Sequence, residues 1–195
     1  MAKRKENITK GKIIKAAWEL FYENGYEDTT IEEIIELSET SKGSFYHYFK
    51  GKDALLSSLS YLFDERYEEL MEEMPDDMNC FDKLMYINAD AFKMVENRIS
   101  LDLLARLYSS QLITKSEKHL LDRSRTYYKL LRLTVKKGQE SGELRDDVTT
   151  GEIVKAYALC ERALLYDWCI CNGEYALREY SKRMMPIFMS EFRKK

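Results

Sequence analysis

The stretch from Thr40 to Leu56 combines small polar, aromatic and basic side chains in a pattern that fits a DNA groove. On a helical wheel of about 100° per residue, Phe45 and Phe49 fall on one arc and would face a protein core. The residues on the opposite arc would face outward, namely Gly43, Ser44, Tyr46 and His47. Ser41 can cap the start of such a helix with its hydroxyl. The pattern predicts a DNA-recognition helix; a solvated helix with a glycine in its first turn is the alternative.

The segment before this helix has the features of a partner helix. Thr30 and Glu33 form a capping-box pattern, which predicts a short helix that ends near Ser38. An earlier amphipathic helix should end at Gly25. Its apolar face is formed by Ile13, Ala17, Leu20 and Phe21. Two short helices joined by about three residues are the helix-turn-helix layout, in which the second helix enters the major groove.

Three motifs within residues 8 to 58 carry a family resemblance. They are A-A-x-x-L-F, G-Y-x-x-T-T and F-Y-x-Y-F-x-x-K. With these motifs the segment resembles the N-terminal domain of the TetR (tetracycline repressor) family of transcriptional regulators. Weaker similarity continues at G-Q-E-S-G-E-L-R from Gly138 and around Leu165 to Trp168. Two positions depart from the family pattern, because Ile35 replaces a small residue and Glu39 replaces the glycine of the turn.

The resemblance implies a set of residues that bind double-stranded operator DNA. Tyr46 is expected on a phosphate, while Thr30 and Lys52 are expected to hold the DNA backbone through a helix N-terminus and a point charge. The side chains expected to read base edges are those of Lys42, Ser44 and His47. The complete expected set is Thr30, Ser41, Lys42, Gly43, Ser44, Tyr46, His47 and Lys52.

The charge of the chain is segregated along the sequence. A formal net charge of −3 gives no general attraction to nucleic acid. Residues 1–15 carry six basic groups, whereas residues 16–41 carry eight acidic groups and no basic one. A basic N-terminal arm, together with Lys42, Lys50 and Lys52, would form the DNA-binding face. A solvated tail is the alternative for the arm, and the acidic Glu32 and Glu33 would repel phosphates.

Composition and periodicity predict an all-α fold. The chain has only 2 prolines and 8 glycines, too few for a sandwich or barrel with many turns, and it lacks long alternating strand patterns. We expect a DNA-binding domain at 1–52, an unbroken connecting helix within 53–74 that stops before Pro75, and a ligand-binding and dimerisation domain at 75–195. Further helices are expected at about 79–96, 98–112, 115–140, 150–171 and 174–193.

The last two predicted helices indicate a homodimer. The first of them is apolar on almost every side, which is typical of a helix that is buried all round. In the TetR family the final helices pair across a two-fold axis, and this sequence fits that role. The expected interface residues are Val154, Tyr157, Leu164, Met184 and Phe188. Pro186 should kink the last helix. Burial inside one monomeric domain is the alternative.

An effector pocket is implied by the resemblance and is compatible with the composition of the C-terminal helices. Small-molecule sites combine apolar walls with a few polar groups. We expect an apolar or aromatic effector with one polar group, bound by residues among Asn88, Phe92, Arg106, Tyr108, Tyr127, Arg162 and Trp168. The alternative for each of these residues is that its side chain belongs to the ordinary hydrophobic core.

Other classes of protein are not supported by the sequence. Without a signal peptide or an apolar run of about 18 residues, the chain is expected in the cytoplasm and off the membrane. Cys169 and Cys171 would point about 200° apart on a helix, so we expect free thiols and no metal or cofactor. No arranged nucleophile and base are evident, so no enzyme activity is expected. The sequence predicts a repressor released by its effector; a helical interaction module that has lost DNA binding is the alternative.

Overall fold

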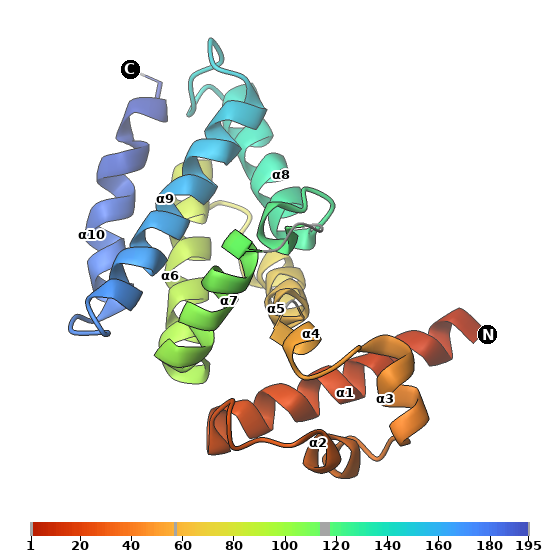
Figure 1. Cartoon of the computed structure of the whole chain (residues 1–195). Coiled ribbons are helices and arrows are strands. Elements are labelled where there is room, and N and C mark those ends of the chain that lie inside the picture. The colour runs from red at the N-terminus through yellow and green to blue at the C-terminus, as the bar shows by residue number, and fades with distance from the viewer. Residues whose placement is uncertain (1, 57, 114–117, 195) are drawn as a thin grey trace. The chain divides into compact units, whose positions relative to one another are not determined.

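The computed structural model describes residues 2–56, 58–113 and 118–194, and the side chains of these except 2–7 and 60–62. Within these ranges the chain is helical and has no strand, which confirms the all-α prediction (Figure 1). The helices are α1 (Ala2–Asn24), α2 (Ile31–Leu37), α3 (Lys42–Tyr48), α4 (Asp53–Leu56), α5 (Leu59–Glu73), α6 (Cys80–Arg98), α7 (Leu101–Ile113), η1 (His119–Leu121), α8 (Thr126–Glu140), α9 (Thr150–Ile170), α10 (Leu177–Met189) and η2 (Ser190–Phe192). None of the described helices has an apolar stretch long enough to cross a membrane.

The helices form two compact units that are discontinuous in sequence. The first unit contains Met1–Leu62 and Ile99–Leu120, and the second contains Phe63–Arg98 and Leu121–Lys195. Helix α7 therefore belongs to the same unit as the helix-turn-helix, although residues 75–195 were expected to form one domain. The chain passes three times from one unit to the other.

Local capping signals define the helices of the first unit. Helix α1 ends before Gly25, whose φ of +85° favours glycine. Thr30 and Glu33 form the predicted capping box, with Glu33 Oε2 accepting from the Thr30 amide at 2.7 Å. Ser41 Oγ accepts from the Ser44 amide at 3.1 Å and caps α3. All three boundaries confirm the sequence prediction. The predicted basic arm begins within α1, and its side chains up to residue 7 lie outside the described set.

The prediction of one unbroken connecting helix is wrong, because α4 and α5 are separate helices. The Ser58 amide donates to the Leu55 carbonyl at 2.8 Å, which is the spacing of a tight turn rather than an α-helix. The Ser58 hydroxyl donates to the same carbonyl at 2.5 Å. It also accepts a hydrogen bond from Trp18 Nε1 of α1 at 3.1 Å. The buried indole of α1 thus fixes the turn at which the connecting segment breaks.

The helix predicted at 115–140 also starts later than expected. Residues 114–117 lie outside the described ranges, and η1 precedes α8. Between them, Asp122 Oδ1 accepts from both the amide and the hydroxyl of Ser124, at 2.9 and 2.7 Å. Such an Asx turn competes with helical hydrogen bonding and delays the start of α8 until Thr126.

In the second unit α10 packs on α6 and α9, and α8 packs on the same two helices (Figure 1). The fully buried side chains Leu84, Leu131, Ile153 and Met185 come from all four helices. Gly138 of α8 permits a close approach, since an added Cβ would lie 2.9 Å from the Cβ of Cys80. Pro186 lies inside α10, which continues to Met189.

The prediction that α9 is buried all round is wrong within the protomer. Tyr157, Glu161, Leu164 and Trp168 are buried, but a second stripe of apolar side chains is exposed. This stripe consists of Leu159, Tyr166 and Ile170, which are 58, 53 and 60% exposed. Helical periodicity alone cannot separate a face that meets the protein's own core from one that remains uncovered.

Candidate nucleic-acid interface

The predicted recognition helix α3 presents a polar face and is anchored by an aromatic one. Phe45 is fully buried and Phe49, which caps the helix C-terminus, is 5% exposed. Lys42, Gly43, Tyr46 and His47 are exposed, and Ser44 is half-buried. The two phenylalanines hold α3 while the opposite face remains available, as the helical wheel predicted.

Lys42 and Glu32 form an ion pair that joins the first turns of α3 and α2. Lys42 Nζ lies 3.1 Å from Glu32 Oε1, and the side chains are 66 and 69% exposed. The hydrogen bond from Lys42 lowers the pKa of Glu32 and raises that of the lysine. Besides the expected repulsion of phosphates, Glu32 thus has a cationic partner 10 positions away in sequence, which no local pattern reveals.

The hydroxyls of Thr30 and Ser41 take part in caps. Thr30 Oγ1 donates to Glu33 Oε2 at 2.7 Å. The Ser41 and Ser44 hydroxyls lie 2.9 Å apart and share a hydrogen bond. These contacts fix the N-termini of α2 and α3, where unpaired backbone amides are suited to phosphates.

Lys52 has a different environment from the one expected of a phosphate contact. Its ammonium donates to the carbonyls of Tyr26, Glu27 and Thr29 at 2.5, 3.1 and 3.0 Å. It also lies 4.5 Å from the centroid of the Tyr26 ring. An ammonium has three donors, and all three are directed into the turn between α1 and α2. Lys52 thus stabilises this turn, which carries Thr30 at the start of α2.

The unusual Glu39 in the helix-turn-helix turn adopts the conformation that favours glycine. Its φ is +51°, so the residue occupies the left-handed region despite its side chain. Its carboxylate lies 3.7 Å from Lys12 Nζ of α1. The departure from the family pattern therefore leaves the turn intact and adds an ion pair between the turn and α1.

The comparison with known proteins agrees with this geometry. A family model described as "Bacterial regulatory proteins, tetR family" matches residues 13–59, the segment from α1 to the start of α5. Over residues 13–59 the chain is therefore similar to the TetR family of bacterial regulatory proteins.

Individual proteins are similar to this chain in sequence or in fold. The transcriptional regulator QacR of Staphylococcus aureus (strain Mu50 / ATCC 700699) is 43% identical over 60 residues, which are 31% of this chain and 32% of QacR. The chain thus spans about a third of that relative. The fatty acid metabolism regulator protein of Bacillus subtilis (strain 168) is 26% identical over 91% of this chain and 92% of its own length. Bacillus subtilis FadR in complex with stearoyl-CoA has a similar fold, with a TM-score of 0.70 at 21% identity over 92% of this chain and 97% of FadR.

The second unit contains a buried carboxyl group that was not among the predicted site residues. Glu161 of α9 is 6% exposed. Its Oε1 accepts from Asn88 Nδ2 at 2.9 Å, and its Oε2 accepts from the Tyr127 hydroxyl at 2.5 Å. Burial raises the pKa of Glu161, and the hydrogen bonds from Tyr127 and Asn88 oppose that rise. The nearby Tyr157 hydroxyl donates to the Leu84 carbonyl at 2.7 Å.

The structure brings together only part of the predicted effector set. Asn88 and Tyr127 meet through Glu161, and Phe92 is buried on α6. Trp168 is buried and donates from Nε1 to the Tyr175 carbonyl at 2.9 Å, which makes it part of the core near the end of α9. Arg162 is half-buried on the same helix.

Arg106 and Tyr108 lie on α7 in the first unit and not with that set. Arg106 Nη2 lies 2.6 Å from Glu27 Oε1, and its Nε donates to Asp102 Oδ2 at 2.7 Å. The guanidinium carbon is 5.1 Å from the Tyr26 ring centroid. Arg106 was expected among the residues that bind the effector, but its contacts lie with the turn between α1 and α2.

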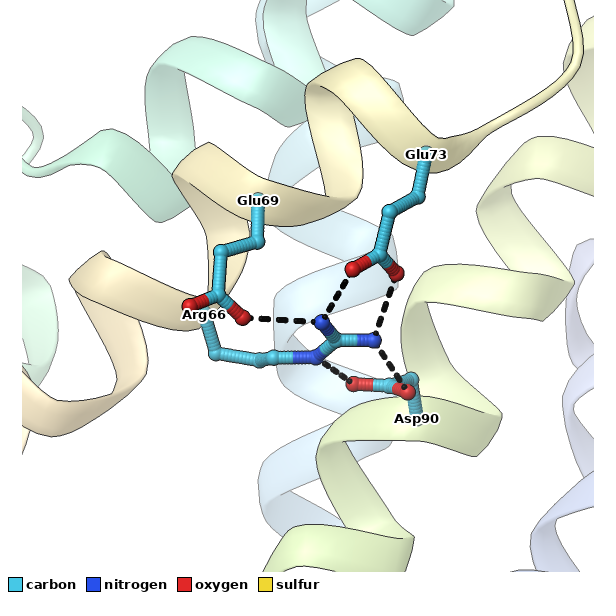
Figure 2. Close-up of polar contacts among 4 residues, drawn as sticks. All are labelled: Arg66, Glu69, Glu73 and Asp90. Atoms are coloured by element: carbon cyan, nitrogen blue, oxygen red, sulfur yellow. Dashed lines mark hydrogen bonds and ion pairs between the residues drawn. The ribbon is translucent and has the colours of Figure 1, made fainter.

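An ion-pair cluster fixes α5 on α6 in the second unit. Figure 2 shows the guanidinium of Arg66 between three carboxylates. It donates to both oxygens of Asp90 at 2.8 and 3.0 Å and to both oxygens of Glu73 at 2.9 Å. Glu69 accepts a further bond at 2.9 Å. The first helix of this unit is thus tied to the helix that carries Asn88.

The structure buries three of the five predicted dimer-interface residues within the protomer. These three residues face the helices that pack on α9 and are Val154, Tyr157 and Leu164. Met184 is half-buried, and Phe188 is 40% exposed. The exposed apolar side chains of the last two helices are instead Leu159, Tyr166, Ile170, Ile187 and Phe188.

Proposed function

We propose that the chain is a homodimeric repressor that binds a near-palindromic operator and leaves it when a small effector binds the second unit. The exposed polar face of α3, held in place by the buried Phe45, is the observation that carries this proposal. A recognition helix of this kind places its N-terminal residues against base edges in the major groove.

The DNA contacts fall into two groups. Lys42, Ser44 and His47 are proposed to read bases, and Tyr46 to bind phosphate through its hydroxyl. The N-termini of α2 and α3, capped by Thr30 and Ser41, present backbone amides to the DNA backbone. Lys52 contributes by holding the turn before α2 through its three carbonyl contacts.

Dimerisation is proposed through the exposed apolar stripe of α9 and the neighbouring face of α10. Leu159, Tyr166 and Ile170 recur at helical spacing, and Ile187 is 63% exposed on α10. The uncovered apolar stripe on α9 and the exposed apolar side chains on α10, which packs on α9, support a two-fold helix pairing. The dimer would bring two copies of α3 to successive turns of the duplex, about 34–36 Å apart.

The effector site is proposed around Asn88, Tyr127 and Glu161 with apolar walls that include Phe92. The buried carboxyl group is the polar end, so the effector should donate a hydrogen bond from an otherwise apolar or aromatic body. The stearoyl-CoA bound to Bacillus subtilis FadR supports a ligand with a long apolar part at this fold.

Coupling to the DNA-binding unit is proposed through α7 as well as through α4 and α5. Helix α6 carries Asn88, and α7 follows it after only two residues. Arg106 of α7 then contacts Glu27 and the Tyr26 ring in the turn before α2. An effector that binds the two states of the protein with a difference of about 1–3 kcal/mol would change operator affinity roughly 5- to 150-fold.

The test begins with selection of duplexes from a random pool, followed by gel shifts on the selected and a scrambled sequence. Tyr46→Phe should weaken binding to both duplexes equally, whereas Lys42→Ala should cost about 1–3 kcal/mol mainly on the selected one. Lys136→Ala removes the same charge from the exposed surface of α8 and should change neither. Selection of no sequence would favour a helical interaction module that has lost DNA binding.

Effectors are then sought by a thermal-shift screen of small molecules. Compounds that stabilise the protein should lower operator affinity, and Glu161→Ala should reduce both effects. Stabilising ligands that never change DNA affinity would contradict the regulatory half of the proposal.

A further inference from the structure

We infer that Glu32 and Lys42 act together as a reader of one G·C base pair, with the lysine on guanine and the carboxylate on cytosine. This inference rests on the proposed DNA-binding function and adds Glu32 as a specificity-determining residue.

The two charged groups stand side by side on adjacent helices of the helix-turn-helix. Glu32 is the second residue of α2, and Lys42 is the first residue of α3. Their hydrogen bond of 3.1 Å places a donor next to an acceptor at the start of the recognition helix, where base edges are met. Both side chains are about two-thirds exposed, so a duplex can reach both.

The major-groove edge of a G·C pair has the complementary pattern. Guanine presents the O6 and N7 acceptors to a lysine, and the cytosine N4 amino group is a donor that glutamate accepts. An ammonium has three donors and a carboxylate about four acceptor positions. One mutual hydrogen bond therefore leaves capacity on Lys42 and on Glu32 for the base pair, and the ion pair need not break on binding.

Glu32 also discriminates by repulsion. A carboxylate in the groove is repelled by phosphates on every sequence, and only a base donor offsets that cost. An acceptor such as thymine O4 at the same place would face the carboxylate with a lone pair. Glu33 cannot substitute for Glu32, because its carboxylate closes the capping box with Thr30.

The ion pair also prepares Lys42 for binding. A free lysine side chain loses rotamer entropy when it becomes fixed on a base. The bond to Glu32 restricts Lys42 before DNA arrives, which reduces that loss on the operator. Exposed pairs of this kind shift an equilibrium only a few-fold, so the pair remains able to adjust to the groove.

The experiment compares duplex selection by the wild-type full chain with selection by Glu32→Gln, Lys42→Ala and Glu36→Gln. We expect the first two variants to lose preference for G·C at the same single position of each half-site, by about 5- to 150-fold, with the other positions unchanged. The double variant should lose no more at that position than the larger single loss, because both residues act on one base pair.

Glu36→Gln is the matched control, since it removes the same charge from another exposed position of α2. It should leave the base preferences unchanged. If Glu32→Gln strengthens binding to all duplexes without changing any preference, Glu32 only repels phosphate and the inference is overturned. Failure of the wild type to select any sequence would overturn the proposed function, and the inference with it.

Discussion

Arg106 of α7 contacts the turn between α1 and α2 at two residues. Its Nη2 atom lies 2.6 Å from Glu27 Oε1, and its guanidinium carbon lies 5.1 Å from the Tyr26 ring centroid. Lys52 holds the same turn by its three backbone carbonyl contacts. Two cations, one from α7 and one from the turn before α4, thus contact the same segment of a few residues. The position of α2 depends on both.

Replacing Arg106 with alanine should destabilise the first unit, because it removes the ion pairs to Glu27 and Asp102 and the contact with the Tyr26 ring. Each of these is a weak interaction at an exposed site. Arg106→Lys keeps the charge and should lose about half as much. Urea unfolding measures the difference, with the exposed Arg123→Ala as the control. Equal stability of the two alanine variants would show that Arg106 does not hold the turn.

Replacing Arg66 with alanine should have a larger effect, because it leaves three carboxylates without their shared cation (Figure 2). Hydrogen bonds to charged groups contribute about 1.5–3 kcal/mol, and the loss should be of this order. Arg66→Lys cannot form the paired contacts to Asp90 and Glu73 and should restore only part of the stability. Chemical denaturation is the measurement. An alanine variant no less stable than the exposed Arg98→Ala would contradict the assignment.

The stability of the second unit should depend on the ionisation of Glu161. Because burial raises the pKa of this carboxyl group above its usual value of 4.5, the folded state favours the protonated form. Its contribution is complete below about pH 4.5 and is lost as the pH rises through the raised pKa. We expect the unfolding free energy of the wild type to fall relative to Glu161→Gln over this interval. Parallel pH profiles of the two proteins would refute the prediction.

Gly138→Ala should destabilise the chain, although alanine favours helices. The new Cβ would lie 2.8 Å from Leu144 Cδ1 and 2.9 Å from Cys80 Cβ, and such overpacking costs about 1–3 kcal/mol. Gly151→Ala in α9 is the control, since no atom lies within 4 Å of its added Cβ. It should be neutral or stabilising by up to about 1 kcal/mol. Thermal unfolding of both variants decides the matter; similar shifts would show that Gly138 is not tightly packed.

Ile170→Glu and Ile187→Glu should convert the proposed dimer into a folded monomer. Both side chains are exposed within the protomer, so a charge does not disturb its core but would be buried unpaired in a dimer. Leu133→Glu on α8, where the leucine is 49% exposed, is the control for an apolar residue outside the proposed stripe. Light scattering gives the masses. Dissociation by Leu133→Glu alone would place the interface on another face.

Features set by neighbouring residues could be predicted from the sequence. The caps formed by Thr30, Glu33 and Ser41 and the end of α1 at Gly25 depend on side chains within three or four positions. The recognition helix could be predicted for the same reason, since its two phenylalanines follow the helical period.

Features set by distant residues could not be predicted. The break after α4 involves Trp18, 40 positions before Ser58. Glu161 meets Asn88 and Tyr127, which are 73 and 34 positions away, and no local pattern distinguishes these partners from others. The apolar residues of α9 were recognised, but their division into a covered and an uncovered face required the positions of α6, α8 and α10.

The interleaving of the two units limits how this protein can be recombined with its relatives. A fragment that ends at Leu62 would leave out α7, including Leu103, Leu104 and Leu107, which are buried in the complete chain. A chimera made by a single crossover after α4 would combine a foreign α7 with the Tyr26 turn and replace Arg106 by whatever residue the donor carries. Exchange of operator specificity should therefore transfer residues 99–120 together with the helix-turn-helix, as two cuts in the gene rather than one.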